Sequence, residues 1–239
     1  MRSHAVSVIL PVFNGARYLA EALRSVLGQT EPPGEVLVVD DGSTDGSSEV
    51  ARGFGPVVTC IMQSHAGLSS ALNRGIERAR GTLLAFLDSD DLWTERKLSR
   101  QLDVLAADER LDAVFAHFEQ FVSPELDTAA APDIPEGGRW LPGWLLGCMV
   151  IRTEAFHRVG SFDPQWRIGS FVDWYLRAQD AGLRATMLTD IFMHRRLHTD
   201  NMGTREREFR RDYARILKHA LDRRRRAVGQ AGEAVARSD

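Results

Sequence analysis

The chain has 239 residues, of which 44% are hydrophobic and 26% are charged, and its formal net charge at pH 7 is −3. This length and composition suit a globular protein with one large domain, or one domain with a modest appendage. No apolar run approaches the roughly 20 residues that a membrane-spanning helix needs, which argues against a membrane-embedded polymer synthase. Cys60 and Cys148 lack the spacing of a metal or redox site, so we expect buried, reduced thiols.

Charge is distributed unevenly along the chain. Residues 205–239 hold eleven Lys or Arg against six Asp or Glu, whereas residues 1–204 hold 19 against 27. We expect residues 1–204 to form the domain and residues 205–239 a basic C-terminal helix and tail. This segment could stay solvated, pair with the acidic body, or make a peripheral contact with anionic lipid. Its arginine run lacks interleaved aromatic residues, which disfavours nucleic acid as a partner.

The N-terminal stretch does not read as a secretion signal. Its apolar core breaks at Pro11 and runs into the polar Asn14 and Gly15 without a small-residue cleavage site. Together with the cysteine usage, this favours a cytoplasmic location, with the membrane surface as a further possibility for the basic tail.

Short β-branched segments alternate with amphipathic ones in the first half of the chain. The patterns predict strands at residues 5–12, 35–40, 57–63 and 82–88 and helices at residues 16–29, 43–54 and 67–79. This alternation is typical of an α/β fold with a mostly parallel sheet that helices cover on both faces. Ligands of such sheets bind at the carboxyl ends of the strands.

Acidic residues follow two of these predicted strands. Asp40 and Asp41 end one strand, and Asp88, Asp90 and Asp91 follow another, so both groups can face one crevice. Residues two apart in an extended segment project to the same side, so Asp88 and Asp90 can approach one divalent cation. A nucleotide diphosphate would supply further oxygen ligands to Mg²⁺ or Mn²⁺.

The second half of the chain is less regular. The patterns predict a helix at residues 99–109, a strand at 112–121, a loop at 122–139, helix or helix–strand segments at 143–162 and 172–183, and a helix from about residue 205. Asp91 is a candidate N-cap for the first of these helices, which would then start near Trp93. Four tryptophans in this half could stack on sugar rings or pack in the core: Trp140, Trp144, Trp166 and Trp174.

Several motifs, taken in order, resemble those of the family 2 glycosyltransferases. They are "VSVILPVFNGARYLAEALRSVLGQT", "VLVVDDGSTDGS", "GLSSALNRGIERARGTLLAFLDSDD" and "RRLHTDN", and the resemblance covers roughly residues 5–203. It implies a GT-A fold with a Rossmann-like sheet. It also implies an inverting transferase that takes a sugar from a nucleotide diphosphate, expected to be UDP, with Mn²⁺ or Mg²⁺. The acceptor would be a glycan, a lipid carrier, a peptide or a small metabolite.

The resemblance also implies roles for individual residues. Position by position, it suggests Pro11, Phe13 and Asn14 in the nucleotide crevice, Asp40 at the base, Arg74 near the phosphates, Asp88 at the ribose, Asp90 at the metal, and Arg196 and His198 at the diphosphate or the metal. A neutral His198 could ligate the metal, and a protonated one could stabilise the diphosphate. The alternatives are a turn role for Asp40, a solvated helix position for Arg74 and a surface loop for His198.

Inversion requires a base that takes a proton from the acceptor. The resemblance implies the Asp of a Glu-Asp pair that opens a helix, but the matching stretch, "RIGSFVDWYLRAQDAG", departs from that pattern. If Ser170 and Phe171 occupy the pair, no carboxylate is present; if Val172 and Asp173 do, Asp173 is the base. We take Asp173 because it is the nearest carboxylate. Its alternative role is to cap the helix or to pair with Arg177.

Two other functions are compatible with these residues. A sugar nucleotidyltransferase shares the sheet and the metal, but "PVFNGARYL" matches poorly the Gly-rich, basic loop with which such enzymes grip a triphosphate. A binding module without turnover would keep the nucleotide site, and a missing base at Phe171 would permit it.

Overall fold

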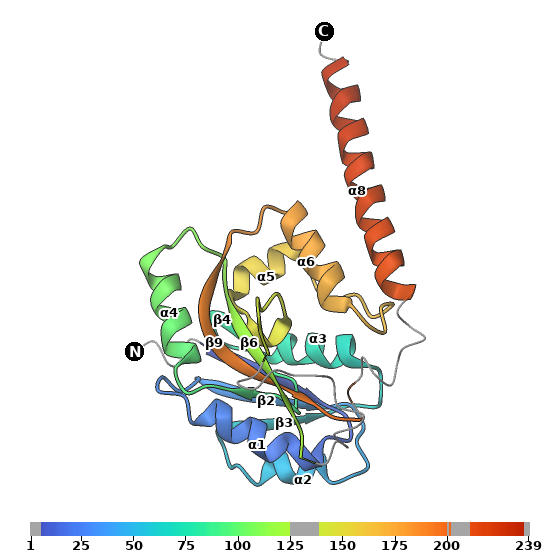
Figure 1. Ribbon diagram of the computed structural model, residues 1–239. Coiled ribbons are helices and arrows are strands. Elements are labelled where there is room, and N and C mark those ends of the chain that lie inside the picture. Colours follow the sequence, from blue (N-terminus) through green and yellow to red (C-terminus); the bar gives the residue numbers. More distant parts are fainter. Residues whose placement is uncertain (1–5, 125–138, 200, 202–210, 237–239) are drawn as a thin grey trace.

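The computed structural model describes residues 6–124, 139–199, 201 and 211–236, and one sheet runs through its body (Figure 1). Within these residues the strands are β1 (Val6–Val12), β2 (Glu35–Asp40), β3 (Val58–Met62), β4 (Leu83–Phe86), β5 (Leu92–Trp93), β6 (Ala113–Val122), β7 (Arg139–Leu141), β8 (Val150–Arg152) and β9 (Ala185–Leu197). The helices are α1 (Ala16–Leu27), α2 (Ser47–Arg52), α3 (Leu68–Arg78), α4 (Lys97–Ala107), the 3₁₀ helix η2 (Leu146–Cys148), α5 (Thr153–Val159), α6 (Ser170–Asp180) and α8 (Arg211–Ala236). The predicted α/β fold is confirmed.

The first half of the chain forms the parallel part of the sheet. β1 lies between β2 and β4, β3 flanks β2, and all three of these pairs are parallel. Every residue of β1 and β2 is buried, because helices cover both faces and leave no face for polar side chains. Core residues of α1, α2 and α4 pack on one face, and those of α3, α5 and α6 pack on the other.

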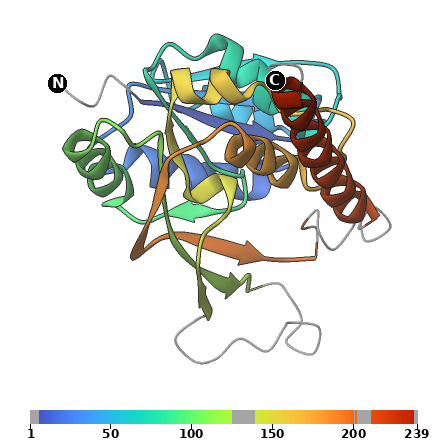
Figure 2. The ribbon, with the colours of Figure 1, turned by 90° about the horizontal axis from the view of Figure 1, so that it is seen from above.

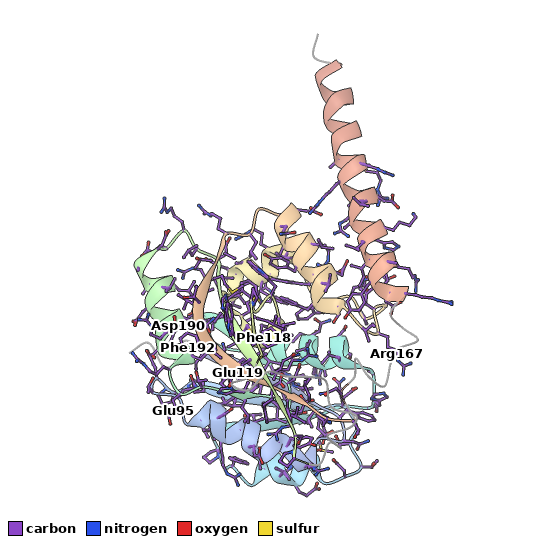
Figure 3. The ribbon with its side chains drawn as sticks, in the orientation of Figure 1. Glu95, Phe118, Glu119, Arg167, Asp190 and Phe192 are labelled. Atoms are coloured by element: carbon purple, nitrogen blue, oxygen red, sulfur yellow. The ribbon has the colours of Figure 1, made fainter. Side chains whose placement is uncertain are left out.

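The second half completes the sheet with mixed pairing. β8 runs antiparallel to both β4 and β6, whereas β9 runs parallel to β6 with an irregular register around His117. Figure 2 shows that the ends of β6 and β9 extend together beyond the helices. Along this pair, Glu119 of β6, labelled in Figure 3, forms an ion pair with His194 of β9, with 2.7 Å between Oε1 and Nδ1.

The residues after the acidic cluster form a strand, so the prediction that Asp91 caps a helix starting near Trp93 was wrong. β5 pairs antiparallel with His194 and Met193 of β9, and α4 begins only at Lys97. The strand forms because a distant segment of the chain supplies its hydrogen-bonding partner, which the local pattern does not reveal.

The C-terminal helix α8 packs against the α6 side of the body and then extends beyond it (Figure 1). The domain boundary predicted between residues 204 and 205 lies outside the described residues. The same is true of most of the predicted loop at 122–139, whose ends belong to β6 and β7. In the part of the chain that the structure describes, no helix is both long and apolar enough to span a bilayer.

The first residue of α4 is a fully buried lysine, Lys97. The Nζ of Lys97 donates a hydrogen bond of 2.7 Å to Oε1 of Gln101 and lies 4.1 Å from the ring centre of Trp93. Gln101 in turn donates to the carbonyl oxygens of Val114 and Cys148, both at 2.8 Å. Loss of hydration lowers the pKa of Lys97 from 10.5 to about 7, since burial disfavours the charged amine.

Replacing Lys97 with methionine should therefore change how stability depends on pH. Between pH 7 and 10.5 the unfolded wild-type chain holds more protons than the folded one. Its free energy of unfolding thus rises with pH in this window, by up to about 1.4 kcal/mol per pH unit. Below pH 7 both states are protonated, and the full cost of the buried charge is present.

Urea denaturation across this window would measure the effect. The stability of Lys97→Met relative to the wild type should fall steadily as the pH rises from 7 toward 10.5. Lys218→Met, which removes an exposed lysine of α8, is the matched control and should keep the wild-type slope. Parallel profiles for all three proteins would contradict the prediction.

Candidate functional site

Three parallel strands end at the same edge of the sheet. Val12 of β1 pairs with Asp40 of β2, and Ile9 of β1 pairs with Phe86 of β4. The segments that follow these strands therefore leave from one edge, where ligands of parallel sheets bind. This edge carries most of the residues that the sequence singled out.

Three carboxylates gather in the loop after β4. One oxygen atom from each of Asp88, Asp90 and Asp91 lies within 4.8 Å of the other two. Asp88 reaches solvent, whereas Asp91 is only 5% exposed. The predicted acidic cluster is thus present, with Asp88 exposed to solvent and Asp91 buried.

The crowding changes the acidity of the cluster. The surrounding protein displaces water from Asp88, and the charge of Asp90 adds to this, so the pKa of Asp88 rises to about 6 although the residue still reaches solvent. Burial, followed by the neighbouring charges, raises the pKa of Asp91 well above its ordinary value. The positive charge of Arg195 opposes both shifts. Such a cluster gains from added positive charge, which a divalent cation would supply.

Asp90 contacts a histidine that lies 108 positions later in the chain. Its Oδ2 lies 2.9 Å from Nε2 of His198 and 3.3 Å from Nδ2 of Asn201. The first contact is a hydrogen bond. Two ligands of one octahedral ion, each about 2.1 Å from it, are also about 3 Å apart, so the same two atoms are close enough to bind one ion. The backbone N–H of His198 donates to Oδ1 of Asn201, which fixes this turn. These oxygen and nitrogen donors fit a divalent cation.

Arg196 holds the acidic loop against β9 and α1. Its backbone N–H donates to Oδ1 of Asp91 at 2.8 Å, and its Nε donates to the carbonyl oxygen of Asp90 at 3.0 Å. Its Nη2 pairs with Glu21, and the guanidinium lies 4.7 Å from the ring centre of Tyr18. Only 5% of Arg196 is exposed. These contacts favour a positioning role over the predicted contact with a diphosphate.

Arg195 is a site residue that the sequence reasoning did not select. Successive residues of a strand point to opposite faces, so the side chains of Arg195 and Arg196 leave β9 on opposite sides. The positive charge of Arg195 acts on both Asp88 and Asp91. Its backbone belongs to the β6–β9 pairing, but among the described residues its side chain forms no hydrogen bond or ion pair. The period-two pattern of "HRRL" is the signal that would have separated the two arginines.

Asp40 has one engaged and one unengaged carboxylate oxygen. Its Oδ1 accepts a hydrogen bond of 2.8 Å from the backbone N–H of Ser43, as expected for a turn. Its Oδ2 is buried and has no partner among the described residues. A buried acceptor without a donor is costly, which points to a ligand N–H or O–H. Pro11 is buried in the neighbouring strand.

Asp41 ties together the loop that precedes α3. Its two oxygens accept hydrogen bonds of 2.8 Å from the backbone N–H groups of Ala66 and Gly67, and its Oδ2 lies 2.8 Å from Nδ1 of His65. The ring of His65 stacks on Phe13 with 4.1 Å between ring centres. Phe13 is 47% exposed directly after β1. His65 and Phe13 therefore form an aromatic rim beside Asp40, and His65 is a second residue that the sequence reasoning did not select.

Asn14 braces the same edge of the sheet. Its backbone is left-handed, with φ 52°, and its Oδ1 accepts a hydrogen bond of 2.8 Å from the backbone N–H of Thr44. Its own backbone N–H donates to Oγ of Ser43 at 2.9 Å. Asn14 thus shapes the predicted nucleotide crevice by joining the segments after β1 and β2.

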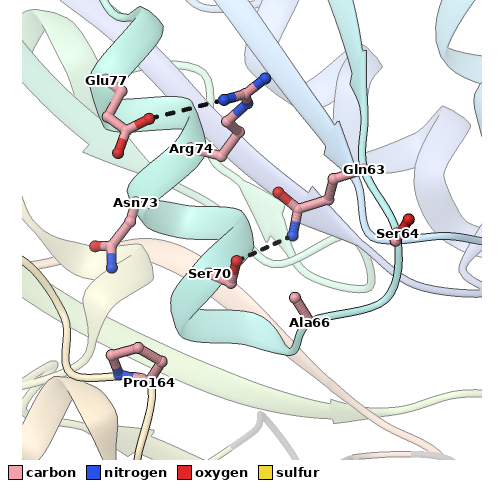
Figure 4. Close-up of a pocket in the computed structure, with 8 residues that line it drawn as sticks. All are labelled: Gln63, Ser64, Ala66, Ser70, Asn73, Arg74, Glu77 and Pro164. Atoms are coloured by element: carbon pink, nitrogen blue, oxygen red, sulfur yellow. Dashed lines mark hydrogen bonds and ion pairs between the residues drawn. The ribbon is translucent and has the colours of Figure 1, made fainter.

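Arg74 lines a pocket of about 530 Å³ beside α3 (Figure 4). The lining residues are Gln63, Ser64, Ala66, Ser70, Asn73, Arg74, Glu77 and Pro164. None of these belongs to the acidic loop after β4. The guanidinium of Arg74 is 4.0 Å from Oε2 of Glu77, which corresponds to the solvated helix alternative.

Asp173 lies in the first turn of α6, as predicted, and is 4% exposed. Its Oδ2 accepts a hydrogen bond of 2.9 Å from Nε of Arg177, and its Oδ1 lies 3.7 Å from Nη1 of Arg223 in α8. Each oxygen of the Asp173 carboxylate thus faces a guanidinium group in the fold. The contacts therefore favour the alternative, pairing with Arg177, over the predicted catalytic base.

Aromatic residues surround the start of α6. Phe171 stacks on Trp174 and Tyr175, with ring centres 6.1 and 6.0 Å away. Of the four tryptophans, Trp166 and Trp174 belong to the core, whereas Trp140 and Trp144 are 62% and 46% exposed. In the alignment that places Ser170 and Phe171 at the acidic pair, this end of the helix offers an aromatic surface and no carboxylate.

Comparisons with known proteins agree with this geometry. The sequence model of glycosyl transferase family 2 matches residues 7–158. A protein of Rickettsia typhi described as an uncharacterised glycosyltransferase is 31% identical over 179 residues, covering 67% of this chain and 54% of that protein. The chain spans about half the length of several curated relatives that it matches.

Two solved structures share the fold. S. aureus TarS in complex with UDP-GlcNAc superposes with a TM-score of 0.67 at 18% identity, covering 84% of this chain and 60% of TarS. The mannosyltransferase PcManGT from Pyrobaculum calidifontis, in complex with GDP-Man and Mn²⁺, gives a TM-score of 0.64 at 25% identity, covering 93% and 64% of the two chains. The fold is therefore that of the GT-A glycosyltransferases.

Proposed function

Since the chain belongs to glycosyl transferase family 2, we propose that it transfers a sugar from UDP to an acceptor hydroxyl, with inversion and with a divalent cation at Asp90. The observation that carries this proposal is the 2.9 Å approach of Asp90 to His198 inside a cluster of three carboxylates at the carboxyl edge of the sheet. The same fold holds UDP-GlcNAc in TarS and GDP-Man with Mn²⁺ in PcManGT.

Asp90 and His198 would hold the cation, with Asp88 beside them. An imidazole nitrogen favours Mn²⁺ over Mg²⁺, because Mg²⁺ is the harder ion and strongly prefers oxygen ligands. When bound, the cation neutralises charge that develops on the departing diphosphate. Arg196 keeps the loop in place through the carbonyl oxygen of Asp90.

Arg195 would supply the protein's own positive charge to the diphosphate. Its charge already acts on Asp88 and Asp91, so it lies near the place where the metal would sit. A guanidinium suits this task because it stays protonated and offers several donors to phosphate oxygens. Arg195 thus takes the contact with the diphosphate that the sequence suggested for Arg196. Arg74 stays a candidate only for a more distant contact with the phosphates.

Asp40 supports uracil as the base. Its Oδ2 is the oxygen without a partner among the described residues, whereas Oδ1 already accepts a hydrogen bond from Ser43. Uracil presents one imide N–H, whereas guanine presents two adjacent donors that suit a carboxylate with both oxygens available. The exposed ring of Phe13 offers a surface on which a base can stack.

A binding module without turnover is the second candidate function. Two observations favour it: Ser170 and Phe171 carry no carboxylate, and Asp173 is engaged by two arginines. Inversion through Asp173 would require that at least one of these ion pairs opens when the acceptor binds. Release of free sugar or transfer from a UDP-sugar would decide for the enzyme.

Calorimetric titration of UDP into the protein tests the donor site. We expect binding with Mn²⁺ that EDTA abolishes, and weaker binding of GDP than of UDP. Asp40→Asn should weaken UDP binding about 10- to 100-fold, since the variant loses the charge-assisted hydrogen bond that the buried carboxylate would accept from uracil. Asp108→Asn, the same change at the exposed end of α4, is the matched control and should bind like the wild type.

The possible failures of this experiment have different meanings. Tighter binding of GDP than of UDP would overturn the assignment of the base but keep the metal site. UDP binding that is indifferent to EDTA would overturn the metal site. Equal UDP affinity in Asp40→Asn and the wild type would remove Asp40 from the donor site.

A further inference from the structure

One face of α8 carries exposed apolar side chains. Tyr213, Leu217 and Leu221 are 43%, 53% and 54% exposed, and their four-residue spacing places them in one row along the helix. Ile216 and Ala220, on the neighbouring face, are buried against the body. The helix therefore has two apolar faces. One packs against the body, and the other is exposed to solvent.

Basic residues border this row. Residues 211–227 hold seven Lys or Arg against two Asp or Glu. Arg225 continues the row one turn beyond Leu221, and Lys218 lies beside Leu221 at a spacing of three residues. Both are exposed. An apolar row flanked by exposed cations is the pattern of a helix that lies in a membrane interface.

Two other arginines fix the orientation of the row. Arg223 and Arg224 pair with Asp180 of α6 at 3.4 and 2.6 Å, and Arg223 also reaches Asp173. These contacts hold one side of α8 on the body, and Figures 1 and 2 both show α8 beside α6. The apolar row is thereby kept on the outside of the protein.

We infer that the row formed by Tyr213, Leu217 and Leu221, with its flanking cations, docks on an anionic lipid surface. The leucines would enter the boundary between headgroups and acyl chains, and Lys218 and Arg225 would bind anionic headgroups. The acidic body, with 19 basic against 27 acidic residues in residues 1–204, is repelled by the same surface and faces away from it. Two copies of α8 that packed against each other through this row would instead bring the seven Lys or Arg of residues 211–227 in one copy close to the same seven in the other, and these like charges would repel.

Vesicle flotation with the full chain tests this inference. Vesicles of phosphatidylcholine alone are compared with vesicles that also contain phosphatidylglycerol, at low and at high salt. We expect binding only to the anionic vesicles and its loss at high salt. Arg225→Gln should weaken binding about fivefold, which is about 1 kcal/mol per basic residue at the surface. The double variant Leu217→Ser/Leu221→Ser should weaken it at least tenfold.

Val57→Ser/Met62→Ser is the matched control, because it removes two side chains that are 41% and 55% exposed on the body. It should float like the wild type, and UDP titration should be unchanged in all variants. A wild-type protein that ignores anionic vesicles overturns the inference, as does a leucine double variant that still floats. Light scattering that shows a dimer lost in the leucine variant, with no flotation, would assign the face to a second copy.

Discussion

Replacing Asp90 with asparagine should lower the rate of UDP-sugar turnover about 1000-fold. The substitution removes a charged oxygen from the Asp90–His198 pair, whose atoms are 2.9 Å apart, and with it the main attraction for a cation. Without the cation, the charge on the departing diphosphate would lose its main stabilisation. The rate is measured as UDP release from a panel of UDP-sugars in the presence of Mn²⁺.

Asp90→Asn should keep the fold, because the amide can still receive its neighbours' hydrogen bonds and Arg196 contacts the backbone of this residue rather than its side chain. Thermal unfolding of the variant checks this. Asp108→Asn is again the control for the chemical change. A variant that turns over UDP-sugar at the wild-type rate with Mn²⁺ would remove Asp90 from the catalytic machinery.

Replacing Asp173 with asparagine should mainly lower stability, by about 2–3 kcal/mol. The change leaves Arg177 and Arg223 without the charge that they share at the junction of α6 and α8. Arg177 keeps its hydrogen bonds to the carbonyl oxygens of Val159 and Ser161, which limits the loss. At a temperature where the variant is folded, we expect UDP-sugar turnover to stay within about threefold of the wild type, because arginines engage both oxygens of Asp173 in the fold.

Asp180→Asn is the control for the Asp173 prediction. It disrupts the outer pairs with Arg223 and Arg224, which are more exposed, so its cost should be below about 1 kcal/mol. The opposite pattern at Asp173, with unchanged urea denaturation and a rate loss of about 1000-fold, would identify Asp173 as the base.

Much of the fold could be predicted because its first half follows local rules. Buried parallel strands read as continuous apolar runs, and the helices between them show apolar residues at helical spacing, as in Leu19, Leu23 and Val26 of α1. The clustering of Asp88 with Asp90 could also be predicted, since two residues separated by one position stay close in any conformation.

The second half resisted prediction because its structure depends on distant partners. β5 exists through pairing with β9, and β8 through pairing with β4 and β6. A run as short as Leu92–Trp93 has no period from which a strand could be recognised. The base assignment failed to resolve for a similar reason. Local spacing allowed Asp173 to be a base or a partner of Arg177, and the contacts with Arg177 and Arg223 in the folded chain favour the second.

The sequence by itself determined that this chain forms an α/β sheet of the family's type with carboxylates at the ends of its strands, because these features depend on residues that are close along the chain. Tertiary structure alone decided which residues join those carboxylates. It brought His198 to Asp90 across 108 positions, tied Arg196 to the backbone of the acidic loop, and brought the charge of Arg195 close enough to act on Asp88. It also left Oδ2 of Asp40 without a partner among the described residues. The physical reason is that a strand's alternation fixes which side chains share a face, whereas packing of the whole sheet fixes what that face meets.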